Sequence, residues 1–359
     1  MLKITSPFHG AVLNRNHGHL VDEGLRIVVR GEAPLRDRVT VNDMPAQRAR
    51  TEFSADLLLR DKETDIVAVA TGACGAREHR IRVVWDRHSR SRYRFSIDDN
   101  SFFLRDIAQK QYPSLFDGFY LNGLRNLNKH YGAKFVLNIY YTTGDDFNLT
   151  EFPDRYKREW RDAAGWLKLA FHAYANLPDR PYQYSSAQKL AADFDLVAEQ
   201  IRRFAGDDTY SPPTVIHWAM LQPTALPVLA QRGVRVLSAG FGWANRGNDI
   251  NYMLDDERTA WLSRNEALKD FETGIVFSKA DLICNSTPIE RIVPLLEAAA
   301  HDPMRAEIMD IFTHEQYFWP FYQSYIPDHF QRLDTAIRWV TEHGYGPVFF
   351  HEGFLGGPE

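Results

Sequence analysis

The character of the sequence changes near Tyr93, and this change constrains the fold more than any other feature. Residues 1–88 hold short stretches rich in β-branched residues, separated by turn residues, with no helical segment between them. Such spacing is typical of an antiparallel sandwich. From Tyr93 onward strand-like and helical stretches alternate, which indicates parallel β/α units. We therefore expect a multi-domain chain, with an all-β, Ig-like sandwich over 1–88 and an α/β domain over 93–359, in which this number of units favours a barrel.

The elements expected in the two parts follow from periodicity and from turn, cap and breaker residues. Strands are expected in the first part at 25–30, 39–41, 53–59, 65–70 and 79–85. The charged run 86–92 is interpreted as a linker. Strands of the second part are expected at 93–99, 134–141, 167–171, 214–217, 234–238, 275–277, 282–284, 306–312 and 347–350. Helices are expected at 115–131 (ending at Gly132), 154–164, 186–205, 223–232 and 328–343, and a further helix begins at Pro288 with Thr287 as N-cap.

Composition excludes some classes of function. The chain carries 42 basic and 47 acidic residues, a net charge of −5, which is not the basic footprint of a nucleic-acid binder. It shows neither the apolar core of a signal peptide nor the roughly 18 apolar residues of a membrane span. We therefore expect a cytoplasmic protein without membrane or nucleic-acid partners. The two cysteines, Cys74 and Cys284, offer no disulfide framework and are interpreted as small buried hydrophobes.

Four of the expected strands end in side chains that can bind a metal or move a proton. These side chains are the pair Asp98-Asp99 and the residues His172, His217 and His314. In parallel α/β barrels the chemistry lies at the carboxyl ends of the strands. Taken singly, each residue could be a helix cap or a buried polar group. Together they indicate a metal hydrolase, because imidazole and carboxylate are the ligands of catalytic zinc.

Residues 93–350 resemble the NodB-homology polysaccharide deacetylases of carbohydrate esterase family 4, within an uncharacterised bacterial branch. The resemblance rests on the pair Asp98-Asp99 and on the segments 171–176, 179–182, 216–218 and 313–318. It implies a deformed (β/α)7-type barrel of the NodB/glycoside hydrolase-deacetylase kind. It also implies metal-dependent removal of an acyl group, N-acetyl in the first instance, from a sugar or oligosaccharide.

The same resemblance assigns roles to individual residues. Asp98 corresponds to the general base that activates a metal-bound water, and His314 to the acid that protonates the departing amine. Asp99 and His172 correspond to metal ligands. The chain departs from the family pattern at Asn100, where the family has glycine, and at 211–213, where only the prolines of an Arg-x-Pro-Tyr motif are present.

The third metal ligand has two candidates. Asn176 stands where the family has the second histidine of a His-x-x-x-His motif. His217, at the end of the next expected strand, is preferred because nitrogen ligands suit zinc or a similar transition metal. Zinc is the expected ion, with nickel, cobalt and iron as alternatives.

Aromatic residues near these positions are candidates for stacking against sugar rings. They are Trp218, Trp243, Tyr317, Phe318 and Trp319. Each could equally pack at the rim of the barrel. Two further readings stay open: a non-catalytic carbohydrate-binding protein on a decayed deacetylase barrel, and a hydrolase of another C–N bond, in a cyclic amide or ureide. The sequence does not give the role of the N-terminal part or the oligomeric state.

Overall fold

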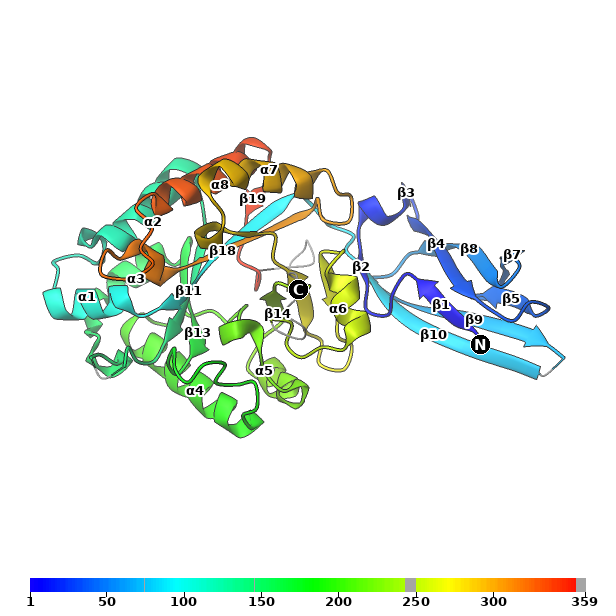
Figure 1. Cartoon of the computed structure of the whole chain (residues 1–359), viewed down its shortest axis with the longest axis horizontal. Coiled ribbons are helices and arrows are strands. Elements are labelled where there is room, and N and C mark those ends of the chain that lie inside the picture. Colours follow the sequence, from blue (N-terminus) through cyan, green and yellow to red (C-terminus); the bar gives the residue numbers. More distant parts are fainter. Residues whose placement is uncertain (74, 145, 243–249, 353–359) are drawn as a thin grey trace.

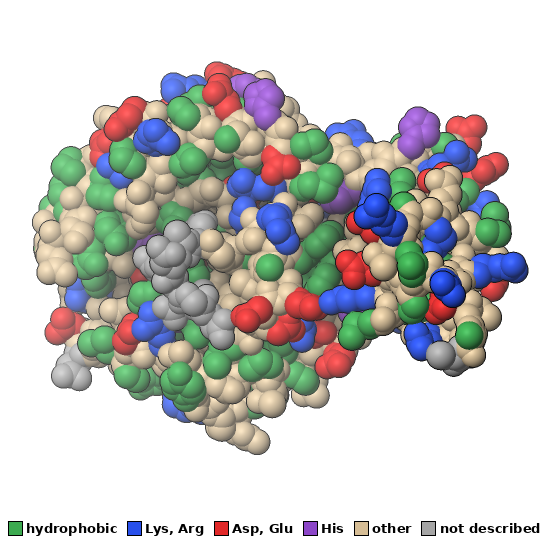
Figure 2. Space-filling view, turned by 45° about the vertical axis from the view of Figure 1, so that its right-hand side comes forward, with side chains coloured by type: hydrophobic (Ala, Val, Ile, Leu, Met, Phe, Trp, Pro, Cys, Tyr) green, Lys and Arg blue, Asp and Glu red, His purple; other side chains and the backbone are tan. Residues whose placement is uncertain are grey.

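The computed structural model describes residues 1–359 except 74, 145, 243–249 and 353–359. The fold is mixed α/β, with several sheets. Figure 1 shows the strands of the first 85 residues grouped at one end of the molecule, and the helices α1–α8 in the larger remainder. On the face in Figure 2, basic and acidic side chains are interspersed over both parts, and the described side chains form no continuous basic stripe there.

Two sheets make up the N-terminal part. The strands of the first are β1 (Lys3–Ser6), β3 (His19–Val21), β4 (Gly24–Glu32), β7 (Gln47–Ala49) and β8 (Glu52–Leu59). Those of the second are β2 (Val12–Leu13), β5 (Arg38–Val41), β6 (Met44–Pro45), β9 (Glu63–Gly72) and β10 (Gly75–Trp85). Buried and exposed residues alternate along β4, as expected of a strand with one face on a core. Ile27 of the first sheet and Ile66 of the second belong to one buried cluster. The five strands expected here are confirmed, whereas an Ig-like relationship stays a prediction.

The main sheet of the larger part is parallel. Its order is β13 (Leu167–Ala173), β12 (Phe135–Tyr140), β11 (Arg92–Asn100), β18 (Ile308–His314) and β17 (Leu282–Ile283), with β19 (Gly346–Pro347) beside β11. All six residues of β12 are buried, as in a parallel strand covered on both faces. A second sheet holds β14 (Val236–Ala239), β16 (Val276–Lys279) and β15 (Ala267–Lys269).

Irregular segments connect the two sheets of this part. The Ser211 amide donates to the Leu169 carbonyl at 2.9 Å, and the Ser238 amide donates to Thr214 at 2.6 Å, so residues 211–214 lie between β13 and β14. The strand expected at 214–217 is wrong: His217 instead opens the short 3-10 helix η5 (His217–Ala219). Pro212 and Pro213 lack amide protons and cannot donate to a regular ladder, which accounts for this difference.

Helices surround the sheets of the larger part. They are α1 (Phe102–Lys110), α2 (Phe119–Tyr131), α3 (Lys157–Ala163), α4 (Ala187–Phe204), α5 (Leu226–Gln231), α6 (Asp256–Leu262), α7 (Ile289–Ala300) and α8 (His329–Glu342). Short 3-10 helices are η1 (Arg15–His17), η2 (Leu115–Asp117), η3 (Leu149–Glu151), η4 (Asp154–Tyr156), η6 (Pro223–Ala225), η7 (Cys284–Ser286) and η8 (Glu315–Phe318). None of the helices in the described ranges is long and apolar enough to cross a bilayer.

Several helix boundaries differ from those expected. The stretch 115–131 is divided at Gly118 into η2 and α2, and α1 was not predicted. Helix α2 ends at Gly132, whose φ of 70° is the left-handed conformation that glycine favours, as expected. Helix α7 begins at Ile289, with Pro288 rather than Thr287 as N-cap.

The connection between the two parts is partly buried. Asp86 and Arg92 are buried and form an ion pair at 3.0 Å. Ser89 donates to Glu307 at 2.7 Å, and Arg15 reaches the same carboxylate at 2.7 Å. The stretch 86–92 connects β10 to β11, as expected of a linker; Asp86 and Arg92 in it are buried, whereas Arg87, His88 and Arg90 are exposed. Cys284 is buried, as expected, whereas Cys74 lies outside the described residues.

Candidate metal centre

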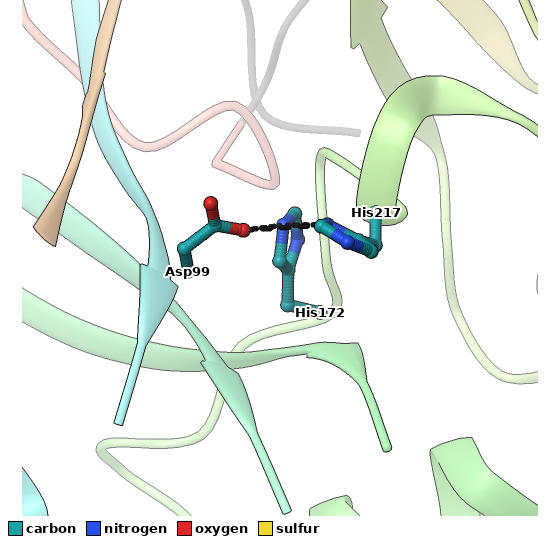
Figure 3. Close-up of side chains that lie close together, drawn as sticks. All are labelled: Asp99, His172 and His217. Atoms are coloured by element: carbon teal, nitrogen blue, oxygen red, sulfur yellow. Dashed lines mark hydrogen bonds and ion pairs between the residues drawn. The ribbon is translucent and has the colours of Figure 1, made fainter. Parts of the chain in front are cut away.

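Asp99, His172 and His217 converge from three different elements (Figure 3). Asp99 comes from β11, His172 from β13 and His217 from η5. Asp99 Oδ1 lies 3.1 Å from His172 Nε2 and 3.3 Å from His217 Nδ1, and the two imidazole nitrogens are 3.2 Å apart. Ligands at about 2.0–2.1 Å from a tetrahedral zinc lie about 3.3 Å from one another. These three side chains could therefore hold a metal ion with little movement.

The orientation of the His172 ring is fixed by a hydrogen bond on the side away from Asp99. Its Nδ1 lies 3.2 Å from the carbonyl oxygen of Val215, which accepts the ring proton. With Nδ1 engaged by Val215, Nε2 is the nitrogen that faces Asp99, and it would offer its lone pair to a metal ion once its proton is lost. A metal-binding histidine commonly donates its second ring nitrogen to a backbone carbonyl in this way.

The protonation of the three groups is coupled. Burial alone would raise the pKa of Asp99, but hydrogen bonds from His172 and His217 hold it well below its usual value. Burial disfavours the charged form of His172, yet the hydrogen bond to Asp99 and the charges of Asp98 and Asp99 raise its pKa. Burial, together with the repulsion from His172, lowers the pKa of His217 despite its contact with Asp99. The site thus combines an ionised carboxylate with an imidazole that stays neutral, both suited to a cation.

A local irregularity of β11 lets adjacent carboxylates line one cavity. The pairing of β11 with β12 shifts register between Ile97 and Asn100, and Asp99 has a φ of 61°. This left-handed conformation is uncommon outside glycine, although aspartate adopts it more readily than most residues. Asp98 and Asp99 consequently both line a cavity of about 710 Å³. Asp98 is buried, and its Oδ1 accepts a hydrogen bond from Asn138 Nδ2 at 2.6 Å.

His314 lines the same cavity from the other side of Asp98. It pairs with Asp98 across β11 and β18, and its Nδ1 lies 2.9 Å from Asn285 Oδ1. Because the amide oxygen accepts the Nδ1 proton, Nε2 is the nitrogen that can exchange a proton with a substrate. Gln316, two residues on, donates to Asp99 Oδ2 at 2.9 Å. The expected base, ligands and acid are thus brought to one cavity.

Asn176 also lines this cavity, but it reaches the centre through Tyr140. Its Oδ1 lies 3.3 Å from the Tyr140 hydroxyl. The same hydroxyl donates to Asp99 Oδ1 and lies 3.1 and 3.3 Å from the two ring nitrogens of His217. Of the two candidates for third ligand, His217 is the one that stands in direct contact with both Asp99 and His172.

Sequence reasoning missed the residues that support the centre, which are Tyr140, Asn138, Asn285 and Gln316. Tyr140 could have been found, because it lies at the end of the expected strand 134–141, where the rule for parallel sheets places functional groups. Asn285 carried the same signal, because it directly follows the expected strand 282–284, whereas Asn138 and Gln316 carried none.

The aromatic candidates separate into two groups. Trp218 and Tyr317 line the cavity, and the Arg180 guanidinium lies 4.6 Å from the centre of the Trp218 ring. Phe318 is instead buried in the core, with the Phe330 ring at 4.6 Å. Trp319 is buried as well and faces a second cavity beside α1. The 3-10 turn η8 and the residue after it point successive side chains in different directions, so Tyr317, Phe318 and Trp319 do not share one wall. Trp243 lies outside the described residues.

Comparisons with known proteins give distant likenesses. No family model matches the chain, and no curated protein matches it. Among solved structures, it is similar to a 4-alpha-glucanotransferase from Thermococcus litoralis (13% identity, TM-score 0.49, 74% of this chain and 40% of that chain). It is also similar to a putative polysaccharide deacetylase involved in O-antigen biosynthesis from Bordetella bronchiseptica (10%, 0.32, 74% and 90%).

A further likeness is to a CE4 family pseudoenzyme from Bacillus anthracis (9% identity, TM-score 0.31, 73% of this chain and 64% of that chain). The chain thus spans less than half the length of the glucanotransferase and less than two thirds of the pseudoenzyme. At these identities and TM-scores no family follows, and the chemistry of the chain rests on the geometry of its own residues.

Proposed function

We propose that this chain is a metal-dependent hydrolase that removes an acyl group, N-acetyl in the first instance, from a sugar or oligosaccharide. The observation that carries the proposal is the convergence of three candidate ligands with two proton-transfer groups around one cavity. We propose in addition that 93–350 forms a distorted (β/α)7-type barrel of the NodB kind, preceded by a separate domain over 1–88.

The donor set of the centre fits a metal such as zinc. Two imidazole nitrogens and one carboxylate oxygen leave a coordination position for water or substrate, which is the pattern of catalytic rather than structural zinc. When bound there, a divalent ion would polarise the acyl oxygen and acidify a water molecule.

The chain's own residues supply the proton transfers. Asp98 takes a proton from the attacking water, and because Asn138 engages Oδ1, the other oxygen is the one left for that proton. His314 gives a proton from Nε2 to the departing amine, with its ring held by Asn285. A general base or acid of this kind contributes about 10²–10⁴-fold to the rate.

One observation favours a second candidate, a non-catalytic carbohydrate-binding protein. The Tyr140 hydroxyl contacts both Asp99 and His217 and satisfies polar groups that a metal would otherwise engage. Asn176 also stands in place of an imidazole. A binding protein, however, does not require a base and an acid beside the same cavity, where Asp98 and His314 are paired across β11 and β18.

Metal content per chain, measured by elemental analysis, separates these functions. We expect near-stoichiometric metal in the parent protein and in Asn176→Ala, and loss of the metal in His217→Ala. Loss in Asn176→Ala alone would instead make Asn176 the third ligand. If the parent contains no metal and cannot be loaded with zinc, nickel, cobalt or iron, the hydrolase is refuted and the binding protein is favoured.

Acetate release from N-acetylated oligosaccharides then tests the reaction. Asp98→Asn should keep the metal and lose activity about 10²–10⁴-fold, because the substitution removes the base but not the ligands. An active Asp98→Asn variant would contradict the role given to Asp98. Activity on cyclic amides and none on acetylated sugars would replace the substrate class.

A further inference from the structure

A second cavity, of about 770 Å³, lies beside α1. Its walls come from the two segments that also build the centre. Asp99 lines the first cavity and Phe102, three residues later, lines the second. Likewise Tyr317 lines the first cavity and Trp319 the second. We call the second cavity the α1 groove; its lining residues are Phe102, Arg105, Asp106, Gln109, Lys110, Phe119, Asp146, Trp319, Pro320 and Phe321.

Four aromatic rings are in contact with one another in the α1 groove; Trp319 is buried beneath the others, and the Arg105 guanidinium lies 5.1 and 5.5 Å from the ring centres of Phe102 and Phe321. The Trp319 ring lies 4.8 Å from Phe119 and 5.5 Å from Phe321, and Phe321 lies 5.1 Å from Phe102. Phe119 is 45% exposed and Phe321 is 60% exposed. Large apolar side chains left together in water, beside polar groups, are typical of a binding surface rather than of a core. The flat faces of these rings suit the apolar face of a pyranose.

The charges in the α1 groove are paired with one another. Arg105 forms an ion pair with Asp146 at 3.3 Å, and Lys110 forms one with Asp106 at 2.8 Å. With two cations and two anions among its lining residues, the groove carries no net charge. It is therefore suited to a neutral ligand with many hydroxyl groups, and less suited to a phosphate, an acidic peptide or a nucleic acid.

We propose that the α1 groove is a subsite for additional sugar residues of an oligosaccharide whose acylated residue lies at the metal centre. This inference rests on the proposed function and deepens it, since it makes the substrate a chain of several sugars. The exposed rings of Phe119 and Phe321 stack on sugar rings, and Arg105, Gln109 and Asp106 lie within the groove as hydrogen-bonding partners for hydroxyl groups.

Calorimetric titration in the presence of a chelator tests the subsite without turnover. The probes are N-acetylchitohexaose, acetylated xylohexaose and cellohexaose, each compared with its monosaccharide. We expect at least one hexasaccharide to bind more tightly than its monosaccharide. Phe321→Ala should weaken that binding about threefold to tenfold, from the loss of one stacking contact. Because Phe321 is exposed, this variant should fold like the parent.

The matched control is Tyr184→Ala, since Tyr184 is 79% exposed and lines neither cavity. This variant should bind the hexasaccharide like the parent. Equal affinity of the parent and Phe321→Ala, or no binding of any hexasaccharide to the parent, would overturn the subsite. A parent that binds hexasaccharides through Phe321 but releases no acetate when loaded with metal would refute the hydrolase and keep the subsite. Acetate release by a parent whose affinity for the hexasaccharide is the same as that of Phe321→Ala would refute the subsite and keep the hydrolase.

Discussion

Tyr140→Phe is the substitution that most directly tests how the metal centre is organised. The Tyr140 side chain is 3% exposed, and its hydroxyl donates to the carboxylate of Asp99. The substitution removes one oxygen atom from a buried site and leaves the ring in place. It therefore deletes the hydrogen bond without opening a large cavity.

The expected loss follows from the role of the hydroxyl. A hydrogen bond to a charged group contributes about 1.5–3 kcal/mol. Residues that orient a metal ligand through such a bond commonly contribute about 10–100-fold to metal affinity. Since a factor of ten corresponds to about 1.4 kcal/mol, the two estimates agree. We expect Tyr140→Phe to raise the dissociation constant for zinc about 10–100-fold.

Competition with a chromophoric chelator at fixed pH measures this dissociation constant. Tyr345→Phe is the matched control, because Tyr345 is also buried and its hydroxyl donates a hydrogen bond of 2.8 Å to the carbonyl oxygen of Ala306. Ala306 lies two residues before β18 begins, at the other end of this strand from His314. It should leave zinc affinity unchanged. If Tyr140→Phe binds zinc as well as the parent, Tyr140 does not position Asp99. Tighter binding would mean that the hydroxyl competes with the ion.

Three further predictions concern stability. Arg94→Leu should cost about 3–5 kcal/mol in urea unfolding, because it leaves the buried Asp310, 2.6 Å from the Arg94 side chain, without its counter-charge; Arg94→Leu/Asp310→Leu should recover most of the loss. Burial lowers the pKa of His329 to about 3, whereas the unfolded chain has a histidine pKa of about 6.5, so the free energy of unfolding should fall as the pH drops below 6.5, by about 2 kcal/mol at pH 5. His329→Gln should flatten this fall between pH 6.5 and 4, and an unchanged slope would exclude His329 as its source. Gly123→Ala would place a Cβ atom 2.3 Å from the Phe330 ring and should lower the free energy of unfolding by about 1–3 kcal/mol, measured by thermal unfolding; adding Phe330→Leu should recover this loss. A Gly123→Ala protein as stable as the parent would show that Phe330 can move aside.

The pattern of apolar residues in the sequence was sufficient to predict those site residues that lie on regular strands. The ends of β11, β13 and β18 were predictable because a buried parallel strand is a short apolar run, and Asp98, Asp99, His172 and His314 lie at or beside the ends of such runs. The ligand atoms of Asp99 and His172 were expected near each other on that basis, and they are 3.1 Å apart.

The positions of the other site residues depend on tertiary packing, which the pattern of apolar residues does not predict. The apolar run before His217 has the composition of a strand, but Pro212 and Pro213 prevent regular pairing, so His217 reaches the centre from a 3-10 turn. Whether Phe318 faces the cavity or the core depends on the path of η8 and on the neighbouring helices, which periodicity does not report. The left-handed conformation of Asp99 was equally beyond a rule based on alternation along a strand.

The placement of His217 on an irregular segment has a consequence for how such a centre can diverge. Asp99 and His172 belong to strands whose packing supports the whole larger part, so few substitutions near them can be tolerated. The residues after Pro213 belong to no regular sheet, and Trp218 and Ala219 have φ values of 63° and 48°. Insertions or exchanges there can alter the third ligand while the strands stay intact. The candidate centre therefore combines two ligands on packed strands with a third on a loop, and exchanges in this loop can change the metal preference while the sheet stays intact.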